Sequence, residues 1–299
     1  MMGFVTTEPW QAPGRIQRWR CGWQKGYATK TREGRFFGRP ALYVQYKEVE
    51  GLNPRQAAFR KRGLRQILTR GGVDTLAFST WGDVLEGTGP RRMESGYLHL
   101  YLAGDVGVHT VGRDDATAVC FFHRVGHLEE RALLKLAARF RYLMITSQRD
   151  EAALCHALRR RYGLPVVGDP TPSQVRRADF ALVSGPVPKA AVLGGHCLAF
   201  APDRRLFRHI PGGRHITGLS LNLPENVAEE IPEGFLPDPL LSEAVRSGCL
   251  DPGKIKIHGL SIDKADENDY NTLGPVGVKH ETGARQCGHR RTWAMSALF

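Results

Sequence analysis

The stretch TAVCFFHRVGHLEERALLKLAARFRYLMITS, residues 117–147, decides the fold of this chain. It begins with the compact apolar run Thr117–Phe122, which has the length and composition of a buried strand. An amphipathic pattern over Leu128–Phe140 predicts a helix, and the apolar run Arg141–Thr146 predicts a second buried strand. A strand, a helix and a strand in this order form a βαβ unit, in which the two strands lie parallel.

The same alternation continues downstream. A helix is predicted from just after Ser147 to Tyr162, followed by strands at Leu164–Val167 and Asp179–Ser184. These strands are apolar without alternation, so helices must cover both faces of their sheet. With right-handed crossovers, the sequence predicts an α/β fold: a Rossmann-like parallel sheet with helices on both faces, over residues 116–262.

Residues 1–115 are predicted to form a separate basic, aromatic-rich α+β region that precedes this sheet. Residues 1–14 have no regular pattern and are expected to be an irregular leader. Alternating aromatic and charged residues predict strands at Ile16–Gln24 and Phe36–Tyr46, joined by a turn within residues 26–34. Asn53-Pro54 predicts a helix start and Gly71-Gly72 its end, and Tyr97–Leu102 is expected to be a strand.

Beyond Gly185-Pro186 the pattern changes to predicted turns. Gly194-Gly195 and Pro211-Gly212-Gly213 each lie between short apolar runs and predict two hairpins. A helix is expected at Pro239–Ser247, capped by Asp238, and a last strand at Lys254–Ile262. Residues 263–299 are polar and without period, and are expected to form a flexible tail.

Composition predicts a soluble protein of the cytoplasm. Hydrophobic residues make up 41% and charged residues 24% of the chain, as in ordinary globular proteins. No apolar run approaches 18 residues, and the first residues lack the features of a secretory signal. Six scattered cysteines without a CxxC pair indicate reduced thiols.

The net charge of +12 is concentrated in one part of the chain. Between Arg15 and Arg70 there are fifteen Lys or Arg residues and three Glu residues, so the remainder of the chain is balanced. Localised positive charge interleaved with Trp and Tyr is typical of a surface that binds single-stranded nucleic acid.

The leading hypothesis is therefore a non-catalytic binding or scaffold protein that contacts nucleic acid or an acidic protein through this region. A purely protein-binding module and a solvated basic face stay open as alternatives. The residues expected to make the contact are Arg18, Arg20, Arg35, Arg39, Arg60, Lys61, Arg62 and Arg65.

A rival hypothesis places a nucleotide at the βαβ unit. The turn after Phe122 contains Arg124 and Gly126, one glycine where the dinucleotide motif has three. The next strand is followed by Ser147 and Arg149 rather than by an acid, which suits a ribose 2′-phosphate. This stretch resembles the cofactor half of NADP-dependent dehydrogenases, a resemblance that implies an NADP-type oxidoreductase with a degenerate phosphate loop. Alternatively, Arg149 is a solvated residue of the first helical turn and no cofactor binds.

No catalytic signature is present: GxSxG, GxxxxGK[ST] and HExxH are all missing. The sequence thus leaves open whether the protein is an enzyme. No metal site is expected, and the weak candidates are His209 and His215, which flank the second glycine-rich turn. A three-residue loop would place the two imidazoles opposite each other on one face of a hairpin.

Overall fold

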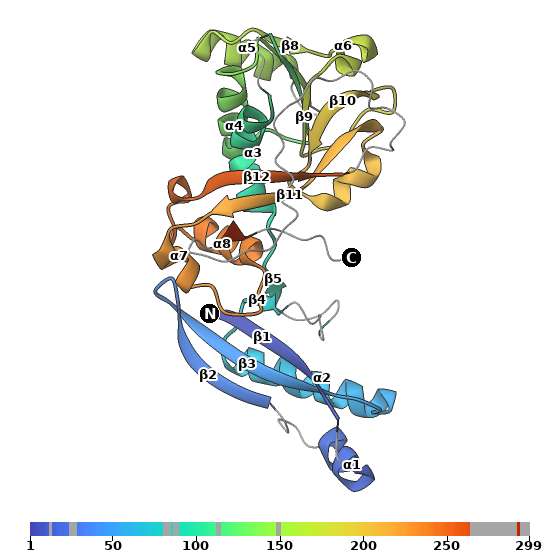
Figure 1. Ribbon diagram of the computed structural model, residues 1–299, viewed down its shortest axis with the longest axis vertical. Coiled ribbons are helices and arrows are strands. Elements are labelled where there is room, and N and C mark those ends of the chain that lie inside the picture. The colour runs from blue at the N-terminus through green and yellow to red at the C-terminus, as the bar shows by residue number, and fades with distance from the viewer. Residues whose placement is uncertain are drawn as a thin grey trace, which may run out of the picture. The chain divides into compact units, whose positions relative to one another are not determined.

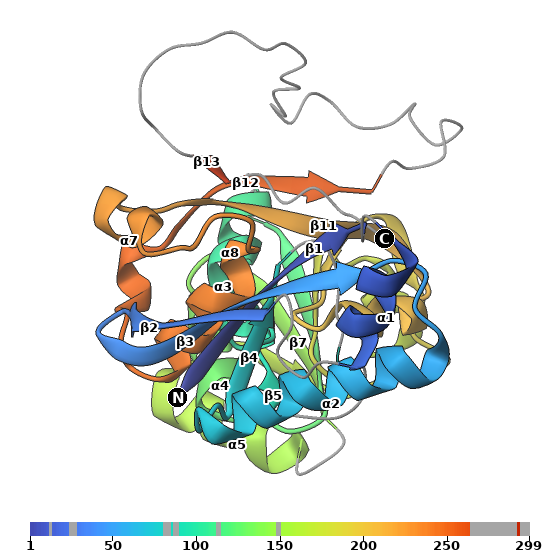
Figure 2. The same cartoon turned by 90° about the horizontal axis from the view of Figure 1, so that it is seen from below.

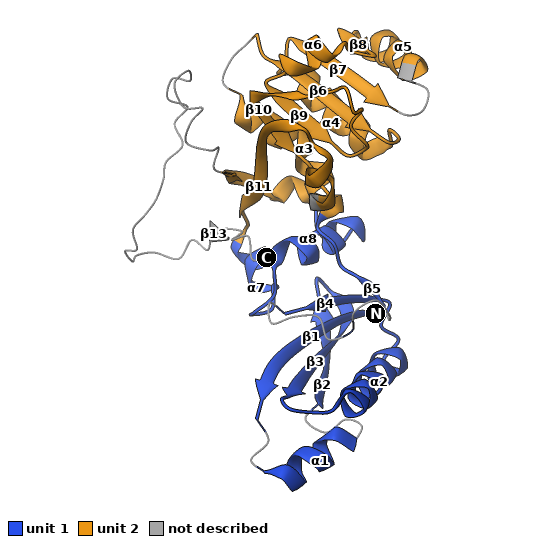
Figure 3. Ribbon diagram, turned by 90° about the vertical axis from the view of Figure 1, so that its right-hand side faces the viewer, with its two compact units in different colours: residues 1–95, 225–251 blue, residues 96–224, 252–299 orange. Residues whose placement is uncertain are grey.

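The computed structural model describes residues 1–11, 14–23, 29–79, 85, 90–111, 115–147, 151–263 and 292–293. The chain divides into two compact units, which Figure 3 shows in different colours. Unit 1 contains residues 1–95 and 225–251, and unit 2 contains residues 96–224 and 252–299. These limits differ from the boundaries expected at 115 and 262, because residues 96–110 pack with the parallel sheet and residues 225–251 pack on the N-terminal one.

Unit 1 is built on a five-stranded sheet with the strand order β2-β3-β1-β4-β5 (Figure 1). Its elements are β1 (Met2–Trp10), α1 (Arg15–Trp23), β2 (Thr29–Phe36), β3 (Arg39–Val49), α2 (Pro54–Arg70), β4 (Thr75–Phe78), β5 (Arg91–Arg92), α7 (Glu225–Glu229) and α8 (Pro237–Arg246).

The central strand of this sheet is β1, so the expectation of an irregular leader at residues 1–14 was wrong. β1 runs parallel to both β3 and β4. Phe4 and Val5 are almost completely buried, one on each face of the sheet. A strand covered on both faces has no alternation of apolar and polar residues, which is why its sequence gave no strand pattern.

A hairpin does occupy this region, but at a different place from the predicted one. β2 and β3 pair antiparallel around a tight turn at Phe37-Gly38, where both residues have positive φ angles, 46° and 76°. Residues Arg15–Trp23, predicted as part of a strand, form helix α1. In a stretch this short, the apolar residues Ile16, Trp19 and Trp23 satisfy helical spacing as well as a strand would.

Helix α2 begins and ends where the sequence predicts. The side chain of Asn53 accepts a hydrogen bond from the backbone of Gln56, and Gln56 returns one to Asn53, which completes a capping box. Leu64 and Leu68 pack with Val5, Leu42 and Val44 on one face of the sheet. On the other face Phe235, from residues 225–251, contacts Phe4 with ring centroids 5.6 Å apart.

Unit 2 is built on an eight-stranded sheet, with the order β12-β11-β10-β9-β6-β7-β8 and β13 paired to β11. Its elements are α3 (Gly96–Thr110), β6 (Thr117–Phe122), α4 (His127–Ala137), β7 (Tyr142–Ser147), α5 (Glu151–Tyr162), β8 (Val166–Gly168), α6 (Pro172–Arg176), β9 (Phe180–Val183), β10 (Leu193–Phe200), the 3-10 helix η1 (Arg204–His209), β11 (Gly212–Asn222), the 3-10 helix η2 (Pro252–Lys254), β12 (Lys256–Ile262) and β13 (Thr292–Trp293).

The six strands from β6 to β11 are parallel and follow the Rossmann order. Numbered in chain order from β6, they read 3-2-1-4-5-6 across the sheet. The order reverses between β6 and β9, which makes that pair the topological switch point of the sheet. The predicted α/β class and the Rossmann-like parallel sheet are therefore confirmed.

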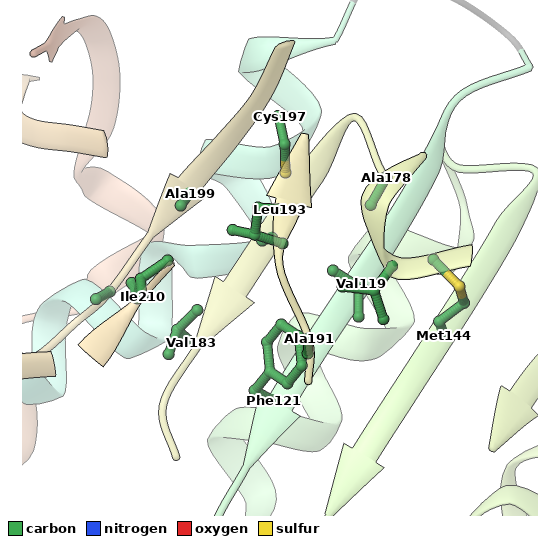
Figure 4. Close-up of a cluster of buried hydrophobic side chains, with 13 residues drawn as sticks. Val119, Phe121, Met144, Ala178, Val183, Ala191, Leu193, Cys197, Ala199 and Ile210 are labelled. Carbon is green, nitrogen blue, oxygen red and sulfur yellow. The ribbon is translucent and has the colours of Figure 1, made fainter. Parts of the chain in front are cut away.

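Helices cover both faces of this sheet, as predicted. One face carries a buried apolar cluster that includes Val119, Phe121 and Val183 (Figure 4). Val175 of α6 belongs to this cluster, and Leu206 of η1 packs against it. On the opposite face α3 and α4 lie against the sheet. A Cβ on Gly107 of α3 would lie 2.9 Å from the ring of Phe180 in β9.

Two other sequence predictions for unit 2 were wrong. Residues 97–102, expected as a strand, belong to α3. Neither glycine-rich turn closes a hairpin: β10 runs unbroken through Gly194-Gly195, and β10 and β11 are parallel strands joined through η1. A glycine pair predicts a turn, but here the glycines allow close backbone approach. A Cβ on Gly212 would lie 2.3 Å from the carbonyl oxygen of Leu193.

The C-terminal elements lie near their predicted positions. Helix α8 starts at Pro237, so Asp238 is in its first turn rather than at its cap, and β12 spans Lys256–Ile262. The tail expected at 263–299 lies outside the described residues except for Asp263 and residues 292–293. Within the described ranges, no helix has the length and apolar character that crossing a membrane requires.

Candidate functional site

The carboxyl ends of β6 and β7 bring together most of the residues predicted to bind a cofactor. The parallel register pairs Phe122 with Ser147, the last residues of the two strands. Arg124 and Gly126 are in the exposed turn between β6 and α4, and Ser147 is half-buried. Arg149 lies outside the described residues. The structure thus places Arg124, Gly126 and Ser147 at one edge of the sheet.

The start of α4 already holds a negative charge. The carboxylate of Glu129 accepts a hydrogen bond of 3.0 Å from the backbone N–H of Gly126. In dinucleotide-binding folds, backbone N–H groups at this helix start approach the pyrophosphate. A phosphate placed beside the Glu129 carboxylate would therefore meet a like charge.

At the topological switch point, the loops after β6 and β9 pack backbone against backbone. A Cβ built on Gly185, in the loop after β9, would lie 2.1 Å from the nitrogen of His123 and 2.3 Å from the carbonyl carbon of Phe122. The N–H of Ser184 donates a hydrogen bond of 2.9 Å to the carbonyl oxygen of Phe121. The loops after β6 and β9 are thus in direct contact.

The turn differs from the usual pyrophosphate-binding turn of dinucleotide folds. The turn has one glycine where close backbone approach uses three, and its N–H is bonded within the protein. Side chains at this edge can also bind an anion. The guanidinium of Arg124 and the hydroxyl of Ser147 are groups that bind a phosphorylated ribose.

Two thiols near this sheet are not nucleophile candidates. Burial raises the pKa of the Cys120 thiol in β6 far above its ordinary value. Burial, with a smaller contribution from the charge of Asp179, does the same to the pKa of Cys197 in β10. Because the thiolate is the reactive form, neither cysteine is a candidate nucleophile in the folded protein.

The basic residues predicted to form one exposed surface include one that is buried. Arg60 is buried, with 4% of its surface exposed. Its guanidinium donates to the carbonyl oxygens of Cys21 at 3.1 Å and Lys47 at 2.6 Å, and lies 5.1 Å from the centre of the Tyr46 ring. Arg60 is thus a structural residue, and its assignment to an exposed surface was wrong.

The other seven residues fall into two groups, one at the β2–β3 turn and one on α1 and α2. Arg35 and Arg39 flank the β2–β3 turn, where Arg39 donates a hydrogen bond of 2.7 Å to the carbonyl oxygen of Ser247. The second group lies on α1 and α2, and α2 runs along the sheet so that Leu64 and Leu68 pack on Leu42 and Val44 of β3. The second group contains Arg18, Arg20, Lys61, Arg62 and Arg65.

Helices α1 and α2 pack side by side near Pro54 (Figures 1 and 2). A Cβ on Gly22 would lie 2.5 Å from the Gln56 side chain, and the rings of Trp23 and Phe59 are 5.7 Å apart. Ile16, Trp19 and Trp23 are 75%, 62% and 43% exposed. Their spacing of three and four residues places them on one stripe of α1, a helical signal that the strand prediction missed.

The two histidines predicted as weak metal candidates do not face each other. His209 ends η1, whereas His215 is in β11, where its ring stacks on Phe207 with centroids 5.1 Å apart. Nδ1 of His215 lies 3.8 Å from the Asp263 carboxylate. In the part of the chain that the structure describes, no three His, Cys, Asp or Glu side chains gather as metal ligands.

Comparison with known proteins finds similar solved structures but does not assign the chain to a family. No protein-family model and no curated protein matches the chain. Shikimate dehydrogenase from Aquifex aeolicus is 9% identical, with a TM-score of 0.31 over 84% of this chain and 95% of its own. A dipicolinate synthase subunit from Bacillus halodurans is 10% identical, with a TM-score of 0.32 over 84% of this chain and 98% of its own.

A third similar structure is quinate dehydrogenase from Corynebacterium glutamicum in complex with NAD. It is 12% identical, with a TM-score of 0.29 over 67% of this chain and 79% of its own. Identities and TM-scores this low do not assign the chain to a family, and the functional proposals below rest on its own residues.

Proposed function

We propose that unit 2 binds a phosphorylated nucleotide at the carboxyl edge of β6 and β7. The observation that carries this proposal is the pairing of Phe122 with Ser147 in a sheet of 3-2-1-4-5-6 order. In open parallel sheets, ligands bind outside the carboxyl ends of the strands near the switch point. Arg124 and Ser147 supply a cation and a hydroxyl there, which favours a ribose bearing a phosphate, as in NADP.

The proposed nucleotide also implies a class of reaction. An NADP-type oxidoreductase is the rival hypothesis that the sequence raises for this unit, and a nucleotide cofactor would supply its hydride chemistry. Because Glu129 accepts the Gly126 N–H, the phosphate contacts in this proposal are assigned to the side chains of Arg124 and Ser147. We assign no hydride-transfer step to these residues.

Isothermal titration of the full chain with NADPH, NADH and ATP tests this proposal. NADPH is expected to bind more tightly than NADH, because only NADPH carries the 2′-phosphate. Arg124→Ala and Ser147→Asp should each weaken NADPH about tenfold, the effect of losing about 1.4 kcal/mol of charge-assisted hydrogen bonding. Arg160→Ala, which removes an exposed arginine of α5, is the matched control and should change nothing.

Two outcomes would overturn the nucleotide proposal. One is no heat of binding with any of the three nucleotides at about 1 mM, the weak end of specific binding. The other is NADPH binding that Arg124→Ala and Ser147→Asp leave unchanged, since the nucleotide would then bind elsewhere on the protein.

A second candidate function, supported by a separate observation, is binding of single-stranded nucleic acid by α1 and α2. Helix α1 contains three arginines and α2 six Lys or Arg residues, and neither helix contains an Asp or Glu. Of these cations Arg60 alone is buried, while Arg18, Arg20 and Arg62 are exposed. Cations neutralise phosphates and the exposed rings of Trp19 and Trp23 can stack on bases.

Fluorescence anisotropy with a labelled 20-nucleotide single strand tests this candidate. Binding should weaken steeply with salt, and Arg18→Ala and Arg62→Ala should each lower the slope of log affinity against log salt by about 0.7. Trp19→Ala should weaken binding about tenfold, the loss of one stacked base. Arg160→Ala is again the control. Binding that resists salt, or no binding at about 50 mM salt, would leave an acidic protein as the partner of these helices.

A further inference from the structure

Unit 2 contains a pocket away from the carboxyl edge of its sheet. It has a volume of about 390 Å³ and lies between α3, α4 and residues 252–257. This is within the range of pockets that hold small organic molecules. Its walls combine apolar side chains, among them Leu102, Ile255 and Ile257, with the cations Arg131, Lys135 and Lys256.

Two contacts between side chains of α3 and α4 form the polar wall of the pocket. Tyr101 and Asp105 are one turn apart on α3, and Arg131 and Lys135 are one turn apart on α4. The guanidinium carbon of Arg131 lies 4.1 Å above the centre of the Tyr101 ring. The ammonium of Lys135 donates to the carboxylate of Asp105. Each of these two contacts joins α3 to α4 and orients one cation, Arg131 or Lys135, in the wall of the pocket.

Close helix packing holds these pairs in place. A Cβ on Gly104 of α3 would lie 2.7 Å from the Cβ of Lys135 and 3.1 Å from the carbonyl oxygen of Ala132. With hydrogen in place of a side chain, the two helices approach closely at this point. The geometry of Arg131 and Lys135 is therefore set before any ligand arrives.

The balance of charge in the pocket is positive. Asp105 neutralises Lys135, which leaves Arg131 and Lys256 without a carboxylate among the lining residues. The Nε of Arg131 is buried and, within the described chain, has no hydrogen-bond acceptor. The guanidinium has further N–H donors on its two terminal nitrogens, and these bind carboxylate or phosphate through charge-assisted hydrogen bonds.

We propose that this pocket binds a small organic anion, a carboxylate or phosphate monoester on an apolar body. Arg131 binds the anionic group, Lys256 strengthens the attraction from the opposite wall, and the apolar side chains contact the body of the molecule. The site is separate from the edge formed by Arg124 and Ser147, so it stands or falls independently of nucleotide binding.

Ligand-observed NMR titration of the full chain with benzoate and phenyl phosphate tests the proposal, with benzyl alcohol as the uncharged analogue. Either anion should bind with a Kd of about 1 mM, as expected for so few atoms. The tighter of the two identifies the anionic group as carboxylate or phosphate. Benzyl alcohol should bind at least about tenfold more weakly.

Variants with opposite expected effects separate a binding role from a structural one. Arg131→Gln should weaken the anion about tenfold and Lys256→Gln several-fold. Asp105→Asn should instead strengthen it several-fold, because it releases the charge of Lys135. Lys254→Gln, an exposed neighbour that does not line the pocket, is the control and should have no effect.

Each variant is first shown to be folded by its thermal unfolding curve. A pair of residues that only joined helices would lose stability in Asp105→Asn without any gain in anion affinity, and that result would overturn the proposal. So would equal binding of benzyl alcohol, or failure of both anions to bind at about 10 mM.

Discussion

The guanidinium of Arg60 donates a hydrogen bond of 3.1 Å to the carbonyl oxygen of Cys21 and so attaches α1 to α2. A second bond of 2.6 Å reaches the carbonyl oxygen of Lys47 in β3. One buried cation of α2 therefore joins α1, α2 and β3 through hydrogen bonds.

Replacing Arg60 by methionine should destabilise unit 1. Arg60→Met keeps the length of the side chain but leaves the carbonyl oxygens of Cys21 and Lys47 without this donor. We expect a loss of about 2–4 kcal/mol in the free energy of unfolding, measured by urea denaturation, and faster proteolysis within α1. Arg62→Met, at the exposed position two residues further along α2, should cost less than about 0.5 kcal/mol. Equal losses in the two variants would contradict the structural role.

Gly185 should tolerate no side chain. In Gly185→Ala the new methyl group would lie 2.1 Å from a backbone nitrogen, so the loops after β6 and β9 must separate. We expect a loss of at least about 2 kcal/mol, as for overpacked sites, seen as a lower thermal midpoint. Gly96→Ala is the control, since the nearest atom to its Cβ is 4.0 Å away. Similar midpoints for both variants would mean that these loops are not in contact.

Removing the carboxylate of Glu129 should lower the stability of the protein and raise its affinity for a phosphate. Glu129→Ala frees the Gly126 N–H and removes a negative charge from the start of α4. We expect a loss of about 0.5–1 kcal/mol in stability. NADPH affinity by isothermal titration should rise roughly fivefold, the equivalent of about 1 kcal/mol.

The neighbouring carboxylate serves as the control for this prediction. Glu130 accepts a hydrogen bond from the hydroxyl of Tyr162 instead of from the turn, so Glu130→Ala should not release the Gly126 N–H. An unchanged NADPH affinity in Glu129→Ala would show that the phosphate does not approach this helix start.

Asp203 should stabilise the fold only above acidic pH. Hydrogen bonds from the Arg205 side chain, and then from its backbone, lower the pKa of Asp203 below the ordinary value. Its stabilising effect is therefore complete above the unfolded-state pKa of about 3.9 and is lost as the pH falls through the lower folded-state value.

Asp203→Asn tests this pH dependence. The carboxylate is 40% exposed and screened by solvent, so we expect a difference of only about 0.5 kcal/mol from the original protein at pH 7. The difference in thermal midpoint should shrink below about pH 4. Glu233→Gln, at an exposed position, is the control. A difference that stayed constant down to low pH would contradict the assigned ionisation.

Local pattern alone predicted the elements whose signals lie close together in the chain. The apolar runs of β6 and β7 and the amphipathic stripe of α4 determined the parallel sheet, because each is set by neighbouring residues. The cap of α2 at Asn53 is a contact between residues three apart, and it too was predictable. The location of Arg124 and Ser147 at one edge followed from the same βαβ unit.

Tertiary structure decided the features that depend on distant partners. β1 is a strand because β3 and β4 cover its sides, and Arg60 is buried because the carbonyl oxygens of Cys21 and Lys47 converge on it. The glycines at 185 and 212 mark close backbone contacts rather than turns. In each case the stabilising contacts are made between groups far apart in the sequence, so no local sequence pattern predicts them.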